Sequence, residues 1–185
     1  MIDDVMLEAE EKMEAALDAA KRELAAIRTG RANPSMFNSI VVDYYGAPTP
    51  LQQLASITIP DARTVIVSPF DRGAMKEITS AIRESDLGVN PTDDGTVIRV
   101  TLPALTEERR KDYVKLARSR AEESRIQVRG IRGKSKKELE AIKKDGEAGE
   151  DDVKRAEGDL DALTKRFVES IDAALTAKEA ELLEV

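Results

Sequence analysis

The chain has 185 residues, of which 41% are hydrophobic, 35% are charged and only 3% are aromatic. At about 100–200 residues per domain, this length allows one ordinary domain or two small ones. The sequence contains no Cys and no His. Their absence excludes disulfides, Cys/His zinc sites and catalysis by a thiol or an imidazole. We therefore expect no metal site and no catalytic residues.

The first residues, Met1-Ile2-Asp3-Asp4-Val5, are acidic and polar, unlike the start of a secretory signal. No stretch of the sequence approaches the roughly 18 apolar residues of a membrane-spanning helix. We expect a cytoplasmic protein with no membrane partner.

Three segments have apolar residues at steps of three and four, the period of an amphipathic helix. The first covers residues 2–27 and ends before Gly30, which would supply a left-handed C-terminal cap. The second is expected to begin after Thr106, and the third follows a turn at 145–149. Because no single helix can bury its apolar stripe alone, the three should pack together as a bundle.

Residues 31–104 differ, because they contain β-branched runs and all seven prolines. Strands are predicted at Ser39–Tyr44, Ser56–Ile59, Arg63–Ser68 and Thr96–Leu102, with one helix at Ala74–Ser85. The predicted fold class is α+β. A long three-helix bundle comprises residues 1–30 and 105–185, and a small β/α/β domain of residues 31–104 is inserted between helix 1 and helix 2. The two connections, 29–32 and 103–106, are the expected hinges.

The net charge of -7 conceals an uneven distribution, since residues 105–144 contain 14 basic and 7 acidic side chains. Residues 145–185 contain 5 basic and 13 acidic ones. Steps of three, four and seven align the basic residues of the second helix in what we call the basic stripe: Lys111, Lys115, Arg118, Arg125, Arg129, Arg132 and Lys136. Either the stripe pairs with the acidic third helix, or it contacts nucleic acid. Its length of roughly 37 Å is the scale of an RNA groove and its flanking phosphates.

Two further features allow two interpretations each. Gly130 and Gly133 each cost about 1 kcal/mol in a helix interior. They would either let a phosphate backbone approach the helix or serve close packing or a local bend. Tyr44 and Tyr45 could stack on a base, although a tyrosine at a strand end is more often packed.

Several multi-residue blocks follow one another in a distinctive order. They are Arg28-Thr29-Gly30-Arg31-Ala32-Asn33-Pro34, Tyr44-Tyr45-Gly46, Asp86-Leu87-Gly88 with Asn90-Pro91, Leu105-Thr106-Glu107-Glu108-Arg109-Arg110-Lys111, and Val128-Arg129-Gly130-Ile131-Arg132. With these blocks the chain resembles the bacterial ribosome recycling factor family from end to end.

The resemblance implies an L-shaped, transfer-RNA-like molecule that is a monomer and has no catalytic site, cofactor or small-molecule substrate. It would act after termination with elongation factor G and GTP, splitting the ribosome into subunits and releasing messenger RNA and deacylated transfer RNA. The bundle would lie on large-subunit ribosomal RNA across the peptidyl and aminoacyl sites. The inserted domain would face the small subunit and be moved by elongation factor G.

Carried over by motif, Arg129 and Arg132 are the strongest candidates for ribosomal RNA contact, and Arg110 and Arg28 come next. The basic stripe adds Lys111, Arg118 and Arg125 as expected ribosomal-RNA-binding residues. The expected hinge residues are Gly30, Arg31, Ala32, Pro103, Ala104, Leu105 and Thr106. Two positions depart from the family pattern. Gly133 stands where a second arginine often follows Arg132, which predicts a weaker RNA contact, and Ala104 replaces a frequent second proline, which predicts a looser hinge.

Three other interpretations fit the sequence less well. An enzyme would need a nucleophile–base pair, which the sequence does not supply. A stand-alone nucleic-acid-binding coiled coil would account for the basic stripe but not for residues 31–104. A nucleotide-exchange or adaptor protein would fit the expected shape but not the stripe.

Overall fold

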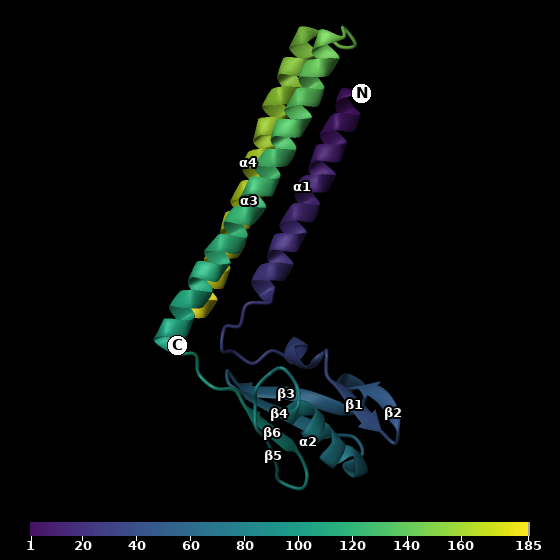
Figure 1. Cartoon of the computed structure of the whole chain (residues 1–185), viewed down its shortest axis with the longest axis vertical. Coiled ribbons are helices and arrows are strands. Elements are labelled where there is room, and N and C mark those ends of the chain that lie inside the picture. Colours follow the sequence, from purple (N-terminus) through teal and green to yellow (C-terminus); the bar gives the residue numbers. More distant parts are fainter. Residues whose placement is uncertain (185) are drawn as a thin grey trace. The chain divides into compact units, whose positions relative to one another are not determined.

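The computed structural model describes residues 1–184. The chain divides into two compact units (Figure 1). The first combines Met1–Arg28 with the segment from Glu107 onward, and the second is Thr29–Thr106. The predicted α+β class is confirmed, because a small unit with β-sheets is inserted between the first and second long helices.

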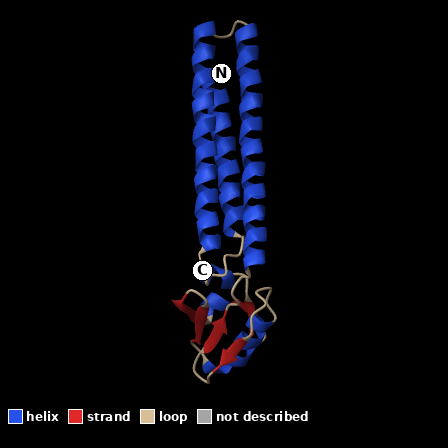
Figure 2. Cartoon of the chain, turned by 90° about the vertical axis from the view of Figure 1, so that its left-hand side faces the viewer, coloured by secondary structure: helices blue, strands red, loops and turns tan. Residues whose placement is uncertain are grey.

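The first unit is a bundle of α1 (Ile2–Ala25), α3 (Glu107–Lys144) and α4 (Glu150–Leu183). α3 and α4 form an antiparallel pair joined by a turn in which Gly146 has φ +71°. α1 packs against both and runs in the same direction as α4, so the three helices lie side by side (Figure 2). With 38 residues, α3 is about 57 Å long. Residues 1–184 include no helix with the length and apolar character needed to span a membrane.

The side of α3 that faces the bundle interior consists mostly of small residues. Its buried residues, called here the seam, are Ala117, Ala121, Ser124, Val128, Ser135, Leu139 and Ile142. The Ser124 hydroxyl donates to the Arg120 carbonyl at 3.1 Å, so this buried polar group is satisfied. Larger side chains of α1 and α4, including Met13, Phe167 and Ile171, fill the space against the seam. Small residues at the contact let helices approach closely.

Gly30 has a different role from the one that the sequence predicted. α1 ends at Ala25, and the capping residue is Ala26, which has right-handed backbone angles. The predicted helix cap at Gly30 is therefore wrong, although its φ of +75° is left-handed as expected. The glycine lies against the returning connection, and a Cβ added there would be 3.2 Å from Leu105 Cγ.

The inserted unit contains two antiparallel sheets and one α-helix. Strands β3 (Ala55–Asp61), β4 (Thr64–Pro69), β6 (Ile98–Thr101) and β5 (Pro91–Asp93) form a sheet in that order. Strands β1 (Val41–Tyr44) and β2 (Ala47–Pro50) form a hairpin, and the helix is α2 (Met75–Arg83). Short 3₁₀ turns cover Pro34–Phe37, Leu51–Gln53 and Arg72–Ala74. Buried aliphatic side chains and Phe37 give this unit its own core.

Two strands, β2 and β5, were missed by the sequence analysis. Both contain proline, at Pro48 and Pro50 in β2 and at Pro91 in β5. Proline cannot donate to a sheet ladder and is tolerated mainly on edge strands. β2 and β5 are edge strands, since each has a single strand neighbour in the described chain.

Backbone hydrogen bonds hold the last residue of the first connection and the residue before the second connection to the sheet of the inserted unit. The Ala32 N–H donates to the Ala62 carbonyl at 2.7 Å, and the Leu102 N–H donates to the Arg63 carbonyl at 2.7 Å. Both acceptors lie in the turn between β3 and β4. These two bonds anchor the inserted unit's chain to the sheet at both ends, at Ala32 and at Leu102.

We expect opposite effects on stability from alanine at two glycines. Gly30→Ala should lower the free energy of unfolding by about 1–3 kcal/mol, because it places a Cβ at positive φ against Leu105. Gly133→Ala should raise it by about 1 kcal/mol, because this helical position has open space for a Cβ. Urea unfolding followed by circular dichroism measures both changes, and effects of the same sign would contradict this account.

Candidate nucleic-acid interface

The basic stripe lies along the flank of α3, beside the buried seam. Most of its members are exposed, while Arg125 and Arg132 are half-buried. The stripe borders both α4 and solvent, so its members can have different partners.

Three arginines of the stripe pair with carboxylates of α4 in what we call the interhelical ladder. Its pairs are Arg118 Nε with Glu179 Oε1 at 2.7 Å, Arg125 Nε with Asp172 Oδ1 at 2.6 Å, and Arg132 Nε with Asp161 Oδ1 at 2.6 Å. The arginines are seven residues apart, which places them on one side of α3. The pairing interpretation of the basic stripe therefore holds for these three residues.

Arg125 is the most enclosed arginine of the ladder. Its side chain is 17% exposed, and its Nη1 also donates to Glu122 Oε2 at 2.8 Å. Burial alone would lower the pKa of the Arg125 guanidinium, but hydrogen bonds to Glu122 and Asp172 raise it above its ordinary value. Because its Nε and Nη1 are both bonded to carboxylates and its side chain is the most buried of the three, Arg125 is the ladder arginine least able to reach a phosphate.

Arg118 and Arg132 differ from Arg125 in how they use their donors. Each binds its α4 carboxylate through Nε, and neither forms another ion pair within residues 1–184. The Arg132 side chain is 40% exposed. A guanidinium held at Nε keeps its two Nη groups as a planar pair of donors, the geometry that phosphate accepts. The ladder thus orients these two arginines without using all their donors.

Four members of the stripe face solvent and are called here the outward cations: Lys111, Lys115, Arg129 and Lys136. Arg129 is 55% exposed, and its Nη1 is 3.6 Å from Glu122 Oε1. Lys111 Nζ is 3.4 Å from Glu107 Oε1, and both side chains are highly exposed. Exposed ion pairs of this kind contribute little stability. A polyanion can therefore replace them at low cost.

The two glycines of α3 lie on its solvent-exposed surface. Both are exposed, and a Cβ added at either would meet no atom within 4 Å. α3 runs through both positions as one helix. Close packing does not explain these glycines, whereas bare backbone next to Arg129 suits the approach of a phosphate chain.

The remaining predicted residues lie at the ends of the bundle helices. Arg28 is exposed and follows α1, and Arg110 is half-buried in the first turn of α3. α1 and α3 run in opposite directions, so the end of α1 and the start of α3 lie at the same end of the bundle (Figure 1). The predicted hinge residues are all in the connections at 29–32 and 103–106.

Tyr44, the last residue of β1, and Tyr45, in the turn that follows, have different environments. Their rings meet edge to face with centroids 4.6 Å apart, and both hydroxyls donate to Asp71 Oδ2. The Gly73 N–H and these hydroxyls lower the pKa of Asp71, and the bond to Asp71 raises the pKa of Tyr44 and of Tyr45. Tyr44 is half-buried, as the packing interpretation predicted. Tyr45 is 78% exposed, so its ring is open to a partner.

The α4 carboxylates of the ladder, Asp161, Asp172 and Glu179, were missed as functional residues. A signal was present, because Asp172 and Glu179 repeat the seven-residue spacing of the arginines. The general acidity of this helix masked that signal. Within residues 1–184, no group of three acidic side chains is placed to hold a metal ion.

A charge exchange across the ladder tests its structural role. Arg132→Glu should lower the free energy of unfolding by about 0.2–1 kcal/mol, because it places a carboxylate opposite Asp161. Adding Asp161→Arg should restore the lost stability, since the exchanged pair keeps opposite charges in contact. Thermal unfolding of the wild type, both single variants and the double variant checks this. Additive effects of the two substitutions would show that the side chains do not interact.

Comparisons with known proteins agree with this architecture. The family described as ribosome recycling factor matches residues 20–183. Proteins named ribosome-recycling factor from Kineococcus radiotolerans and Beutenbergia cavernae are 64% and 62% identical over 185 residues, covering all of this chain and all of each relative.

Two solved structures are similar over the whole chain. A solution structure of ribosome recycling factor has a TM-score of 0.78 at 39% identity, covering 100% of this chain and 98% of that one. The second has a TM-score of 0.64 at 40% identity, with all of both chains covered. It shows the T. thermophilus ribosome recycling factor and the E. coli elongation factor G bound to the E. coli post-termination complex.

Proposed function

The chain belongs to the ribosome recycling factor family, and from that premise we propose that it binds the post-termination ribosome as a monomer. With elongation factor G and GTP, it promotes disassembly into subunits and release of messenger RNA and deacylated transfer RNA. Support comes from the similar structure of a ribosome recycling factor with elongation factor G on a post-termination complex. The protein is a translation factor rather than a classical enzyme, and GTP hydrolysis would belong to elongation factor G.

The observation that most supports ribosome binding is the arrangement of cations on α3. The outward cations face solvent along the helix, and the ladder holds Arg118 and Arg132 with their Nη groups unused by other ion pairs in the described chain. We propose that this flank binds large-subunit ribosomal RNA across the peptidyl and aminoacyl sites, with Arg129 and Arg132 at its centre. Arg28 and Arg110 would extend the contact at one bundle end, and Arg125 would mainly stabilise the bundle.

The two connections would act as the hinge that lets elongation factor G move the inserted unit. Ala32 is bonded to the β3–β4 turn, so flexing is confined mainly to Gly30, Arg31 and residues 103–106. Hinges of this kind are a few loop residues that absorb the change in backbone angles.

The proposed function is tested by light scattering of post-termination ribosomes mixed with this protein, elongation factor G and GTP. Scattering should fall as subunits separate, and omitting any one component should prevent the fall. Binding to ribosomes without splitting would reduce the proposal to RNA binding alone.

Reversing the charge of Arg129 should weaken ribosome binding. Charge-assisted hydrogen bonds contribute about 1.5–3 kcal/mol, so Arg129→Glu should raise the Kd by about tenfold or more. The matched control is Lys165→Glu on α4, which makes the same charge change at an exposed side chain whose carboxylate neighbour, Glu169, is 3.9 Å away. Cosedimentation with ribosomes measures both.

The control should bind ribosomes with the affinity of the wild type. Equal losses of affinity in the two variants would mean that only the net charge of the protein matters. The exchanged pair Arg132→Glu/Asp161→Arg adds a second comparison. It should have nearly normal stability but weakened binding, because the arginine is transferred to α4.

Stiffening one connection should affect splitting more than binding. The Ala104 N–H makes no hydrogen bond within residues 1–184, so Ala104→Pro removes no bond while it fixes φ near about −65°. We expect unchanged affinity for the large subunit and a slower single-turnover splitting rate at saturation. Ala104→Gly, which loosens the same position, serves as the control. Weaker binding with a normal splitting rate would show that this connection is only a spacer.

A further inference from the structure

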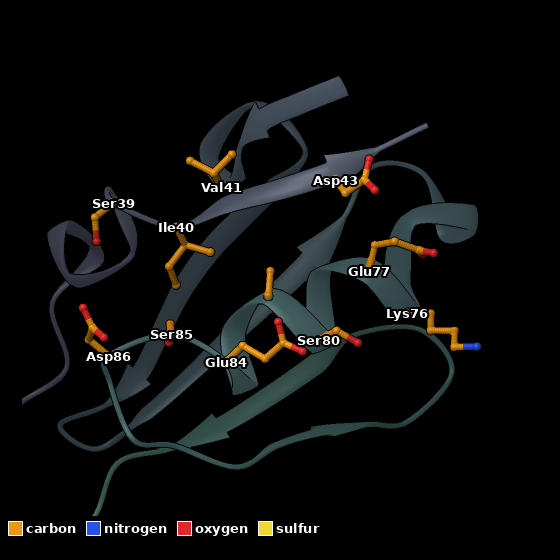
Figure 3. A pocket seen from close by; sticks show the side chains of 11 residues that line it. Ser39, Ile40, Val41, Asp43, Lys76, Glu77, Ser80, Glu84, Ser85 and Asp86 are labelled. Carbon is orange, nitrogen blue, oxygen red and sulfur yellow. The ribbon is translucent and has the colours of Figure 1, made fainter. Parts of the chain in front are cut away.

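A groove of about 570 Å³ lies between β1 and α2 in the inserted unit (Figure 3). Ser39, Val41 and Asp43 line one wall, and Glu77 and other residues from successive turns of α2 line the opposite wall. All lining residues belong to the inserted unit, and none belongs to the basic stripe. The groove is thus a surface separate from the candidate nucleic-acid interface.

The β1 wall of the groove is an unpaired strand edge. Val41 and Asp43 stand opposite Pro50 and Pro48 of β2. Proline has no N–H to donate, so these are the non-hydrogen-bonded pairs of the ladder. The N–H and C=O groups of Val41 and Asp43 therefore point away from β2. Among the described residues, no strand pairs with β1 on that side.

Unpaired edge groups are a template for an added strand. In peptide-recognition domains, an extended segment adds to such an edge, and its alternate side chains enter pockets beside it. β1 has four residues, so it can pair with roughly 14 Å of extended chain. The helix wall gives the groove the strand-and-helix form that suits this mode of binding.

The charge of the groove indicates which segment it would accept. Its lining includes the acidic side chains Asp43, Glu77 and Glu84, with Lys76 as the only basic one. Val41 is an exposed apolar side chain on the same wall. Acidic walls repel a phosphate backbone and favour basic side chains. An extended basic polypeptide therefore fits the groove, and RNA does not.

A second pocket, next to the groove, adds an aromatic surface. It has a volume of about 150 Å³, and Asp43 and Glu77 line it together with Tyr45. Asp71 holds the Tyr45 hydroxyl, while the ring itself is largely exposed. Two carboxylates beside an exposed aromatic ring suit an arginine or lysine side chain, which gains ion pairing and a cation–π contact.

We propose that β1 and α2 form a docking groove for an extended, basic segment of a protein partner. The segment adds as a strand to the free edge of β1 and places one arginine or lysine between Asp43, Glu77 and the ring of Tyr45. This partner surface is additional to the proposed function and does not rest on RNA binding by α3.

The test uses the ¹⁵N-labelled full chain and three synthetic hexapeptides. The first alternates arginine and valine, the second replaces arginine with glutamate, and the third is the first peptide methylated at alternate backbone nitrogens. The Arg/Val peptide should shift the amide signals of Val41 and Asp43 and slow their hydrogen exchange. The glutamate peptide should not bind, because its charge matches that of the groove. The methylated peptide should bind far less tightly, because it cannot complete the ladder.

Side-chain variants test the acidic end of the groove. Asp43→Asn/Glu77→Gln should weaken binding of the Arg/Val peptide by about tenfold. The control Glu23→Gln removes an exposed charge from α1 and should leave binding unchanged. The spectrum of each variant reports whether it is folded, and the three peptides test the wild type without any substitution.

Three results would overturn the proposal. Equal binding of the methylated peptide would exclude strand addition. Shifts of the same amides by a single-stranded RNA oligonucleotide would show that the groove accepts a different class of partner. The protein could also dimerise at high concentration, with slower hydrogen exchange at the Val41 and Asp43 amides. That result would show that a second copy of this chain occupies the groove.

Discussion

The narrow buried seam of α3 is the constraint on which the bundle and its candidate interface both depend. Alanine and serine fill much of the seam, so the neighbouring helices can approach α3 closely. Close approach brings the arginines that flank the seam within 2.6–2.7 Å of α4 carboxylates. A seam of large side chains would move these charges apart. The packing of small residues therefore decides where the guanidinium groups lie and which of their donors stay available.

Pairing with α4 does not by itself exclude the proposed RNA contact for every arginine of the stripe. An arginine has five N–H donors, and the α4 carboxylate uses Nε in Arg118 and Arg132. Arg125 has also committed Nη1, to Glu122. Arginine thus commits two donors within the bundle at one position and only Nε at the others. The carboxylates of α4 orient the three arginines of the ladder.

The two units present surfaces of opposite chemistry. The flank of α3 combines outward cations with exposed glycine backbone, which suits an extended polyanion. The groove beside β1 combines carboxylates with unpaired backbone groups, which suits a basic polypeptide. Because each unit has its own core, a substitution on one surface can be studied without disturbing the other. The two proposed binding surfaces of this 185-residue protein therefore lie on separate elements.

The sequence by itself determined the long helices, the seam of α3, the inserted α+β unit and the family. Each of these depends on local periodicity or on the order of motifs along the chain. It did not reveal β2 and β5, because proline argues against a strand unless the strand is known to lie at an edge. Nor could the sequence assign the role of Gly30. This glycine has a positive φ and lies against Leu105, and it does not cap the helix.

Only the tertiary structure decided the partners of the basic stripe. Periodicity predicts that Arg125 and Arg129 lie on one flank of α3. It does not predict which residues of α4 lie opposite that flank. The register places Asp172 against Arg125 and leaves Arg129 facing solvent. The free edge of β1 is likewise invisible in the sequence, because an unpaired strand is defined by the absence of a neighbour in space. Distances between residues far apart in the chain follow from packing, and packing involves all the elements at once.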